Sequence, residues 1–133
     1  MTVRLFLQIN IGDWKEKGYV KPMLSFASSL ADDVIGTDVD NQSEQHVVDL
    51  VKRLVKQSQQ IFLLAYSSDS GQPLNSILSL VNELFSNKDK IHLAVLSGEH
   101  NTLEKLLGTM DEKFIKNDED ELIKKMIKQF ARG

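Results

Sequence analysis

The chain has 133 residues, of which 41% are hydrophobic and 26% are charged, proportions that are ordinary for a globular protein. This length favours one domain spanning residues 1–133. A formal net charge of -3 gives no general attraction to nucleic acid or to an anionic membrane. The absence of cysteine excludes disulfides, thiolate catalysis and zinc sites built on sulfur. No signal peptide or membrane span is predicted, so we expect a cytoplasmic protein.

The first half of the chain predicts two strands and two helices. Alternating polarity indicates a strand at Val3–Ile9, followed by a long polar loop at Asn10–Lys21. Apolar residues at helical spacing after Pro22 predict a helix, and Val34–Val39 is a short strand that we place at a sheet edge. Asn41 or Ser43 can cap the next helix, whose apolar stripe consists of Val47, Val48, Leu50, Val51, Leu54 and Val55.

The stretch Gln60–Gln72 organises the rest of the prediction. Ile61–Tyr66 is a continuous apolar run, typical of a strand that is covered on both faces in a parallel sheet. A polar turn follows, and a helix is predicted to start at Pro73. Its expected buried residues are Leu74, Ile77, Leu78, Val81, Leu84 and Phe85.

The last third of the chain repeats the alternation. Ile91–Leu96 is a fourth strand, and Asn101 with Glu104 forms a capping-box-like start for a short helix that closes near Gly108. A fifth strand is predicted at Lys113–Lys116, and the last helix is predicted to start at Asp118, with Glu121 three residues later.

Five strands alternating with five helices predict a three-layer α/β fold, in which a parallel sheet carries helices on both faces. The flavodoxin-like strand order 2-1-3-4-5 is the most common for such a sheet. The chain then reverses direction between strands one and three, so the loops Asn10–Lys21 and Tyr66–Gln72 face each other across a crevice. Ser97–Asn101 lies beside the second of these loops.

Open α/β sheets bind ligands at the carboxyl ends of their strands. Small residues and backbone amides in Tyr66–Gly71, just before a helix, can hold a phosphate or carboxylate; alternatively the segment is an ordinary turn in which Asp69 and Ser70 cap the helix. Trp14 could stack on a flat ligand or anchor a partner, or it could cover one end of the core. The candidate ligand-binding residues are Asn10, Asp13, Trp14, Tyr66, Ser67, Ser68, Asp69, Ser70, Gly71 and Ser97.

The histidines do not indicate a metal site, because His46, His92 and His100 fall in different predicted elements without an acidic cluster. His100 is expected to be an accessible loop residue without a special role. The run Asp118–Glu121 precedes a helix that ends in lysines, an order that complements the helix macrodipole. This amphipathic last helix could also serve as a partner interface.

From Ile91 onward the chain resembles the carboxyl-terminal part of a response-regulator receiver domain. The segment IHLAVLSGE puts Ser97 at that family's hydroxyl position, and KFIKN puts Lys116 at its lysine position. The acid pair that the family carries after strand one is replaced by Gln8, Ile9 and Asn10, and its phospho-accepting aspartate by Ala65 or Tyr66. The resemblance therefore implies a receiver-like fold without the carboxylates that bind magnesium and accept phosphate.

The segment KQSQQIFLLAYSSDSG is similar to the helix–strand–loop centre of Toll/interleukin-receptor (TIR) domains, which share the five-strand layout. Enzymatic members of that family carry a glutamate early in the helix after this loop. Here the matching stretch is PLNSILSLVNE, and its only acid, Glu83, comes late. The resemblance thus implies the fold and does not imply NAD cleavage.

We therefore expect a non-catalytic signalling or protein-interaction module of receiver-like fold, with no cofactor, metal or nucleic acid. The alternative is a domain that binds a nucleotide or another small ligand, such as a small anion, through the loops after strands one, three and four. A protein partner is expected in the first case. The sequence leaves open the identity of the ligand or partner and the oligomeric state.

Overall fold

The computed structural model describes residues 4–11, 27, 29–40, 44–67 and 73–132. Its centre is a five-stranded parallel sheet with the order β2-β1-β3-β4-β5. The strands are β1 (Arg4–Ile11), β2 (Val34–Asp40), β3 (Gln60–Ser67), β4 (Ile91–Gly98) and β5 (Phe114–Lys116). The predicted α/β fold with flavodoxin-like strand order is confirmed.

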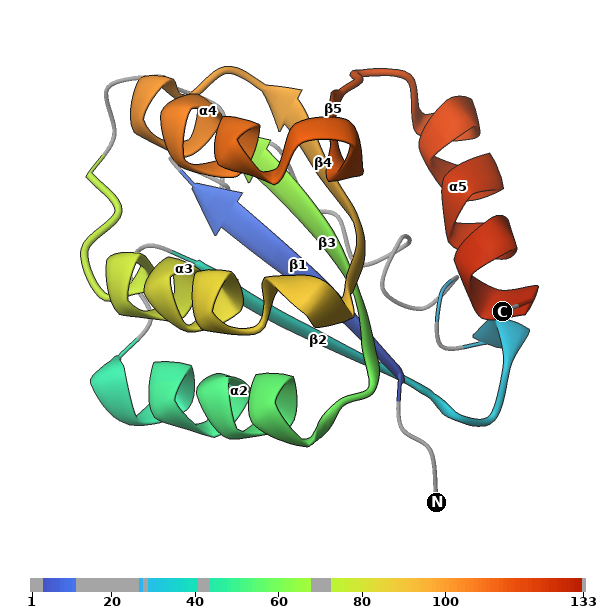
Figure 1. Ribbon diagram of the computed structural model, residues 1–133, viewed down its shortest axis with the longest axis horizontal. Coiled ribbons are helices and arrows are strands. Elements are labelled where there is room, and N and C mark those ends of the chain that lie inside the picture. Colours follow the sequence, from blue (N-terminus) through green and yellow to red (C-terminus); the bar gives the residue numbers. More distant parts are fainter. Residues whose placement is uncertain (1–3, 12–26, 28, 41–43, 68–72, 133) are drawn as a thin grey trace.

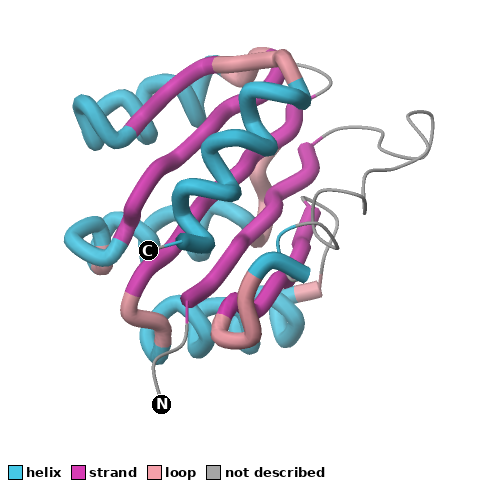
Figure 2. The backbone as a smooth tube through the Cα atoms, turned by 90° about the vertical axis from the view of Figure 1, so that its right-hand side faces the viewer, coloured by secondary structure: helices cyan, strands magenta, loops and turns pink. Residues whose placement is uncertain are grey.

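Helices cover both faces of this sheet. Three of them, α2 (Gln45–Gln57), α3 (Ile77–Ser86) and α4 (Asn101–Leu107), lie side by side on one face (Figure 1). The last helix, α5 (Asp120–Arg132), lies on the opposite face, in front of the strands in Figure 2. Two 3-10 helices, η1 (Lys88–Lys90) and η2 (Gly108–Lys113), precede β4 and β5. Of the helix predicted after Pro22, the described residues Ala27, Ser29 and Leu30 are helical.

The alternation of side chains along each strand produces two apolar cores. Leu5, Leu7 and Ile9 of β1 pack with Leu63 of β3 beneath α2, α3 and α4. Phe6 and Phe62 belong to the other core, beneath α5, where their rings stack with centroids 5.6 Å apart. Because β3 contributes to both cores, all residues from Ile61 to Ala65 are buried, as the continuous apolar run predicted.

The third helix starts later than predicted. It begins at Ile77, whereas the sequence predicted a start at Pro73. The cause is Asn75, whose φ of 53° lies in the left-handed region and prevents a continuous right-handed helix through this position. Turn hydrogen bonds from Ile77 N–H to the Leu74 carbonyl and from Leu78 N–H to the Asn75 carbonyl lead into the helix.

Leu78, which was predicted to be buried, and Leu50, which was placed in the apolar stripe of its helix, are both exposed. Leu50 of α2 is 56% exposed and Leu78 of α3 is 45% exposed. Each helix is amphipathic, but its apolar stripe is wider than the strip of sheet that it covers, so the flank of the stripe faces outward.

His100 is also placed differently from the prediction. It is only 2% exposed and is the N-cap of α4, where its Nδ1 accepts a hydrogen bond from the N–H of Leu103 at 3.1 Å. The expected cap, Asn101, is the first residue of the helix. An imidazole is an uncommon N-cap, and therefore the capping pattern did not reveal it.

Within the part of the chain that the structure describes, no helix is long and apolar enough to cross a membrane.

Candidate functional site

Three polar residues from neighbouring strands form a row at the carboxyl edge of the sheet. The strand register aligns Asn10 of β1 with Tyr66 of β3, and Tyr66 with Ser97 of β4. All three share the face that carries Phe6, Leu64 and Val95, which is the α5 face. Neighbouring strands are about 4.8 Å apart, so the three side chains can contact one small molecule. We call Asn10, Tyr66 and Ser97 the polar row.

Asn10, the first member of the row, is positioned by a hydrogen bond from the side-chain amide of Gln8 in the same strand. Gln8 is 1% exposed, and its Nε2 donates a 3.0 Å hydrogen bond to Oδ1 of Asn10. This bond fixes the amide of Asn10, which is itself 8% exposed. With Oδ1 turned to Gln8, the Nδ2 donor of Asn10 is directed away from it, and none of the described residues accepts a hydrogen bond from this nitrogen.

The last member of the row lies where β4 meets the segment before α5. The carboxylate of Asp118 accepts a 2.6 Å hydrogen bond from the N–H of Gly98. The same Oδ1 lies 3.4 Å from the hydroxyl of Ser97, which is long for a hydrogen bond between oxygen atoms. Asp118 therefore holds the backbone of β4 firmly and the Ser97 hydroxyl only weakly, so that this hydroxyl can bind a ligand.

Gly98 brings β4 unusually close to β3. Its φ is 89°, and a Cβ at this position would lie 2.1 Å from the carbonyl oxygen of Ser67. Only glycine fits such a position, and it lets the ends of β3 and β4 approach each other directly beside Tyr66 and Ser97. Ser67 itself is buried.

Acidic residues flank the polar row at its β2 end. The register places Asp38 beside Gln8 and Asp40 beside Asn10. At the other end stands Asp118. The centre of the row is thus uncharged, with an amide and two hydroxyl groups between carboxylates.

Lys116, at the lysine position of the receiver resemblance, is directed away from the row. Its Nζ forms an ion pair with Oε1 of Glu104 at 2.8 Å. The hydrogen bond from Lys116 lowers the pKa of Glu104, and the same bond raises the pKa of Lys116. Phe114, two residues earlier in β5, packs against the core beneath α4. Side chains two positions apart in a strand share a face, so Lys116 lies on the α4 face of the sheet, whereas Ser97 lies on the α5 face.

The structure thus brings together four of the predicted site residues, namely Asn10, Tyr66, Ser67 and Ser97. Ser67 aligns with Gly98, one position beyond the polar row. Asp13, Trp14, Ser68, Asp69, Ser70 and Gly71 lie outside the described residues.

Sequence reasoning did not assign Gln8, Asp40 and Asp118 to the site. Gln8 carried a signal, because an amide in the middle of a predicted central strand needs a hydrogen-bond partner. Asp118 was predicted only as the start of a helix. Its contact with Ser97 and Gly98 depends on the pairing of β4 with β5, which the local sequence does not encode.

Among the residues described, no group of three or more histidine, aspartate or glutamate side chains is placed to bind a metal ion. No protein-family model matches this chain, and no curated protein matches it.

Proposed function

We propose that this protein is a non-catalytic binding domain that holds a small polar ligand at the carboxyl edge of its sheet. The observation that carries the proposal is the buried amide of Asn10. Burying a polar side chain in an inner strand costs stability unless its groups form hydrogen bonds, and among the described residues only the oxygen of this amide has a partner. A carbonyl or hydroxyl oxygen of a ligand would accept from Nδ2, and the hydroxyl groups of Tyr66 and Ser97 would bind neighbouring polar atoms.

The chemistry of the row supports binding and gives no support to catalysis. Its central groups are an amide and two hydroxyls, the Ser97 hydroxyl faces the carboxylate of Asp118, and Lys116 is held in an ion pair with Glu104. The ends of β1 and β3 carry Asn10 and Tyr66 where phosphotransfer of the receiver kind needs carboxylates. Recognition by a few precisely placed hydrogen-bonding groups is typical of small-molecule sites, and Phe6, Leu64 and Val95 add apolar side chains on the same face of the sheet.

The experiment is a thermal-shift screen with nucleosides, nucleotides, flavins and sugar phosphates. A ligand that binds the native state raises the melting temperature, and the increase grows with ligand concentration. Ser97→Ala should abolish the shift caused by any such ligand. The matched control is Ser86→Ala on α3, whose hydroxyl bonds the Asn82 carbonyl far from the row and whose loss should leave the shift intact. A shift that survives both Ser97→Ala and Asn10→Ala would place the ligand elsewhere and contradict the proposal.

A second candidate is a signalling or protein-interaction module that binds its partner through α5. The outer surface of this helix combines Leu122, which is exposed, with the exposed lysines Lys125 and Lys128. Charge reversal by Lys124→Glu with Lys128→Glu should then abolish capture of the partner in a pull-down assay. The same reversals should leave a ligand-induced thermal shift unchanged, and this difference separates the two candidates.

A further inference from the structure

The outer edge of β2 has backbone groups available for another strand. The N–H of Arg4 donates to the carbonyl of Asp33 at 3.0 Å, so the odd-numbered residues of β2 direct their backbone groups to β1. The N–H and C=O of Gly36 and Asp38 therefore point to the opposite side. β2 is the terminal strand of the sheet order, and no described strand pairs with it there. An open edge of this kind is a template for strand addition.

Apolar side chains lie along the same border of the molecule. Ile35 of β2 is 41% exposed and shares the α2 face of the sheet with Val39. On α2, Leu50 is 56% exposed, and Val47 and Leu54 are partly buried. These four residues, Ile35, Val47, Leu50 and Leu54, form what we call the α2 border.

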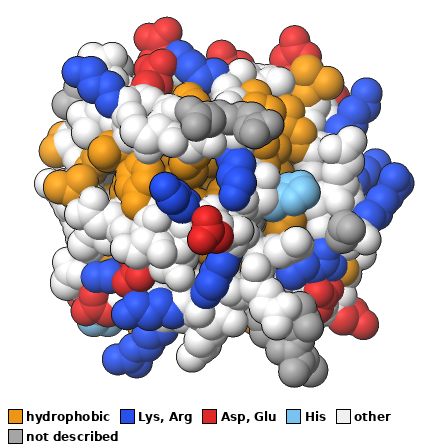
Figure 3. Space-filling view, viewed as in Figure 1, with side chains coloured by type: hydrophobic (Ala, Val, Ile, Leu, Met, Phe, Trp, Pro, Cys, Tyr) orange, Lys and Arg blue, Asp and Glu red, His pale blue; other side chains and the backbone are white. Residues whose placement is uncertain are grey.

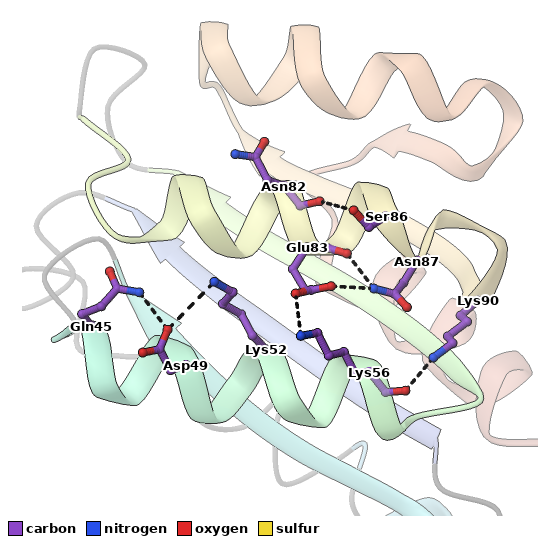
Figure 4. Close-up of polar contacts among 9 residues, drawn as sticks. All are labelled: Gln45, Asp49, Lys52, Lys56, Asn82, Glu83, Ser86, Asn87 and Lys90. Carbon is purple, nitrogen blue, oxygen red and sulfur yellow. Dashed lines mark hydrogen bonds and ion pairs between the residues drawn. The ribbon is translucent and has the colours of Figure 1, made fainter.

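The α2 border faces away from the neighbouring helix. Lys56 of α2 forms an ion pair with Glu83 of α3, and Figure 4 shows Asp49 and Lys52 on the same side of α2. Leu54 lies two positions before Lys56, which is roughly 200° around the helix axis. α2 is the outermost helix on its face of the sheet (Figure 1), and β2 is the terminal strand, so this apolar flank and the open edge of β2 lie on the same side of the molecule.

We propose that a second copy of this chain docks on this border, with the two β2 strands paired antiparallel about a two-fold axis at Thr37. The pairing joins two sheets into one and sets the α2 border of each copy against that of the other. Such an interface is self-complementary, as a two-fold dimer requires. The proposal is independent of the polar row.

The charges of β2 select this register. Antiparallel hydrogen bonding requires the even-numbered residues of the two strands to face each other. Centring on Thr37 places Asp38 opposite Gly36 of the second copy, and Ile35 opposite Val39. Centring on Asp38 would oppose two carboxylates, and centring on Gly36 would oppose Asp40 to Asp32. Like charges directly opposite each other are destabilising, so Thr37 is the favoured centre.

Cross-linking tests the register directly, because the chain contains no cysteine and a single introduced thiol can react only with another copy. In the proposed dimer the two Thr37 residues form a non-hydrogen-bonded pair with Cα atoms about 4.5 Å apart, within the range that a disulfide spans. Thr37→Cys should therefore give disulfide-linked dimers under mild oxidation. Thr102→Cys, at an exposed position on α4, is the control and should remain reduced monomer on a denaturing gel. Equal cross-linking of the two variants would overturn the proposal.

Sedimentation velocity tests the apolar contact. The wild-type protein should sediment as a dimer, and Leu50→Glu should sediment as a monomer with an unchanged circular dichroism spectrum. The matched control is Leu78→Glu, a similarly exposed leucine on α3. Figure 3 shows a separate apolar area between α3 and α4, so this control asks whether exposed hydrophobic surface in general drives association. A monomeric wild-type protein, a dimeric Leu50→Glu variant, or loss of the dimer in Leu78→Glu would each overturn the proposal.

Discussion

At the scale of single residues, Gly98 is the most constrained position beside the polar row. A Cβ there would meet the Ser67 carbonyl at 2.1 Å and would also force an alanine to adopt a φ of 89°. Gly98→Ala should therefore lower the free energy of unfolding by an amount on the order of 2–4 kcal/mol. Urea denaturation measures the loss.

Gly108 provides the control for this substitution. It is in helical conformation, with φ of -58° and ψ of -22°, and a Cβ there meets nothing within 4 Å. Gly108→Ala should be neutral or should stabilise the protein by about 0.4–1 kcal/mol, because alanine restricts the unfolded chain. Equal losses for the two variants would show that Ser67 and Gly98 are not in close approach.

Arg4 joins three segments at the amino edge of the sheet. Its Nε and Nη2 donate to the carboxylate of Asp33 at 2.7 and 2.8 Å, and it also donates to the carbonyls of Phe130 and Ala131 at the end of α5. The hydrogen bond from Arg4 lowers the pKa of Asp33, with the positive charge of Arg4 acting in the same direction and burial opposing both.

This ion pair predicts a pH dependence of stability. A carboxyl group whose pKa is lower in the folded state stabilises that state above its unfolded pKa, and the stabilisation is lost as the pH falls through the folded value. Wild type should therefore be more stable than Asp33→Asn at pH 7, and the difference should shrink below about pH 4 and vanish in stronger acid. Urea denaturation of both proteins between neutral and acid pH checks this. A difference that stays constant over the whole range would contradict it.

Three residues show which contacts the sequence could predict and which it could not. The burial of His100 and its capping of α4 could not be predicted, because a histidine before a helix has no characteristic capping signal. The contact of Asp118 with Gly98 joins residues 20 positions apart, and no local pattern encodes it. The need of Gln8 for a partner, in contrast, was predictable from its place in an apolar strand.

At the scale of elements, β3 is the central strand and contributes to both cores. Leu63 is buried beneath the α2 face, so Leu63→Ala should cost on the order of 2–5 kcal/mol through lost apolar burial and the cavity that remains. The control is Leu78→Ala on α3, whose exposed side chain should cost less than about 0.5 kcal/mol. Thermal or urea unfolding of both variants measures the contrast. A cost below about 1 kcal/mol for Leu63→Ala would contradict the central position of β3.

The strands and helices were predictable where the pattern of apolar and polar residues is clear. The continuous run Ile61–Tyr66 indicated a strand covered on both faces, and the weak pattern of Val34–Val39 indicated an edge, as the structure confirms. The predicted start of α3 at Pro73 was wrong, because Asn75 adopts a left-handed conformation that the periodicity of its neighbours does not reveal. The exposure of Leu78 was not predicted, because periodicity gives the direction of an apolar stripe but not the width of the stripe that the sheet covers.

At the scale of the whole molecule, the strand order determines where a site can form. Because β1 and β3 are neighbours in the order β2-β1-β3-β4-β5, their polar carboxyl ends are brought together, and Ser97 joins them from β4. Alternation of strands and helices was sufficient to predict this arrangement. The amide pair of Gln8 and Asn10, which gives the row its oriented donor, is visible only once the strands are aligned.

The proposed site requires the Nδ2 group of Asn10 to donate a hydrogen bond to a ligand at the carboxyl edge of the sheet. The most direct measurement is a nitrogen–proton correlation spectrum, in which this side-chain amide gives its own pair of signals, recorded with each compound that raises the melting temperature. Such a compound should shift the Asn10 side-chain signals together with the backbone signals of Ser97 and Gly98, and should leave the signals of α3 in place. Shifts confined to α5 or to the α2 border, with the Asn10 amide signals unmoved, would contradict it.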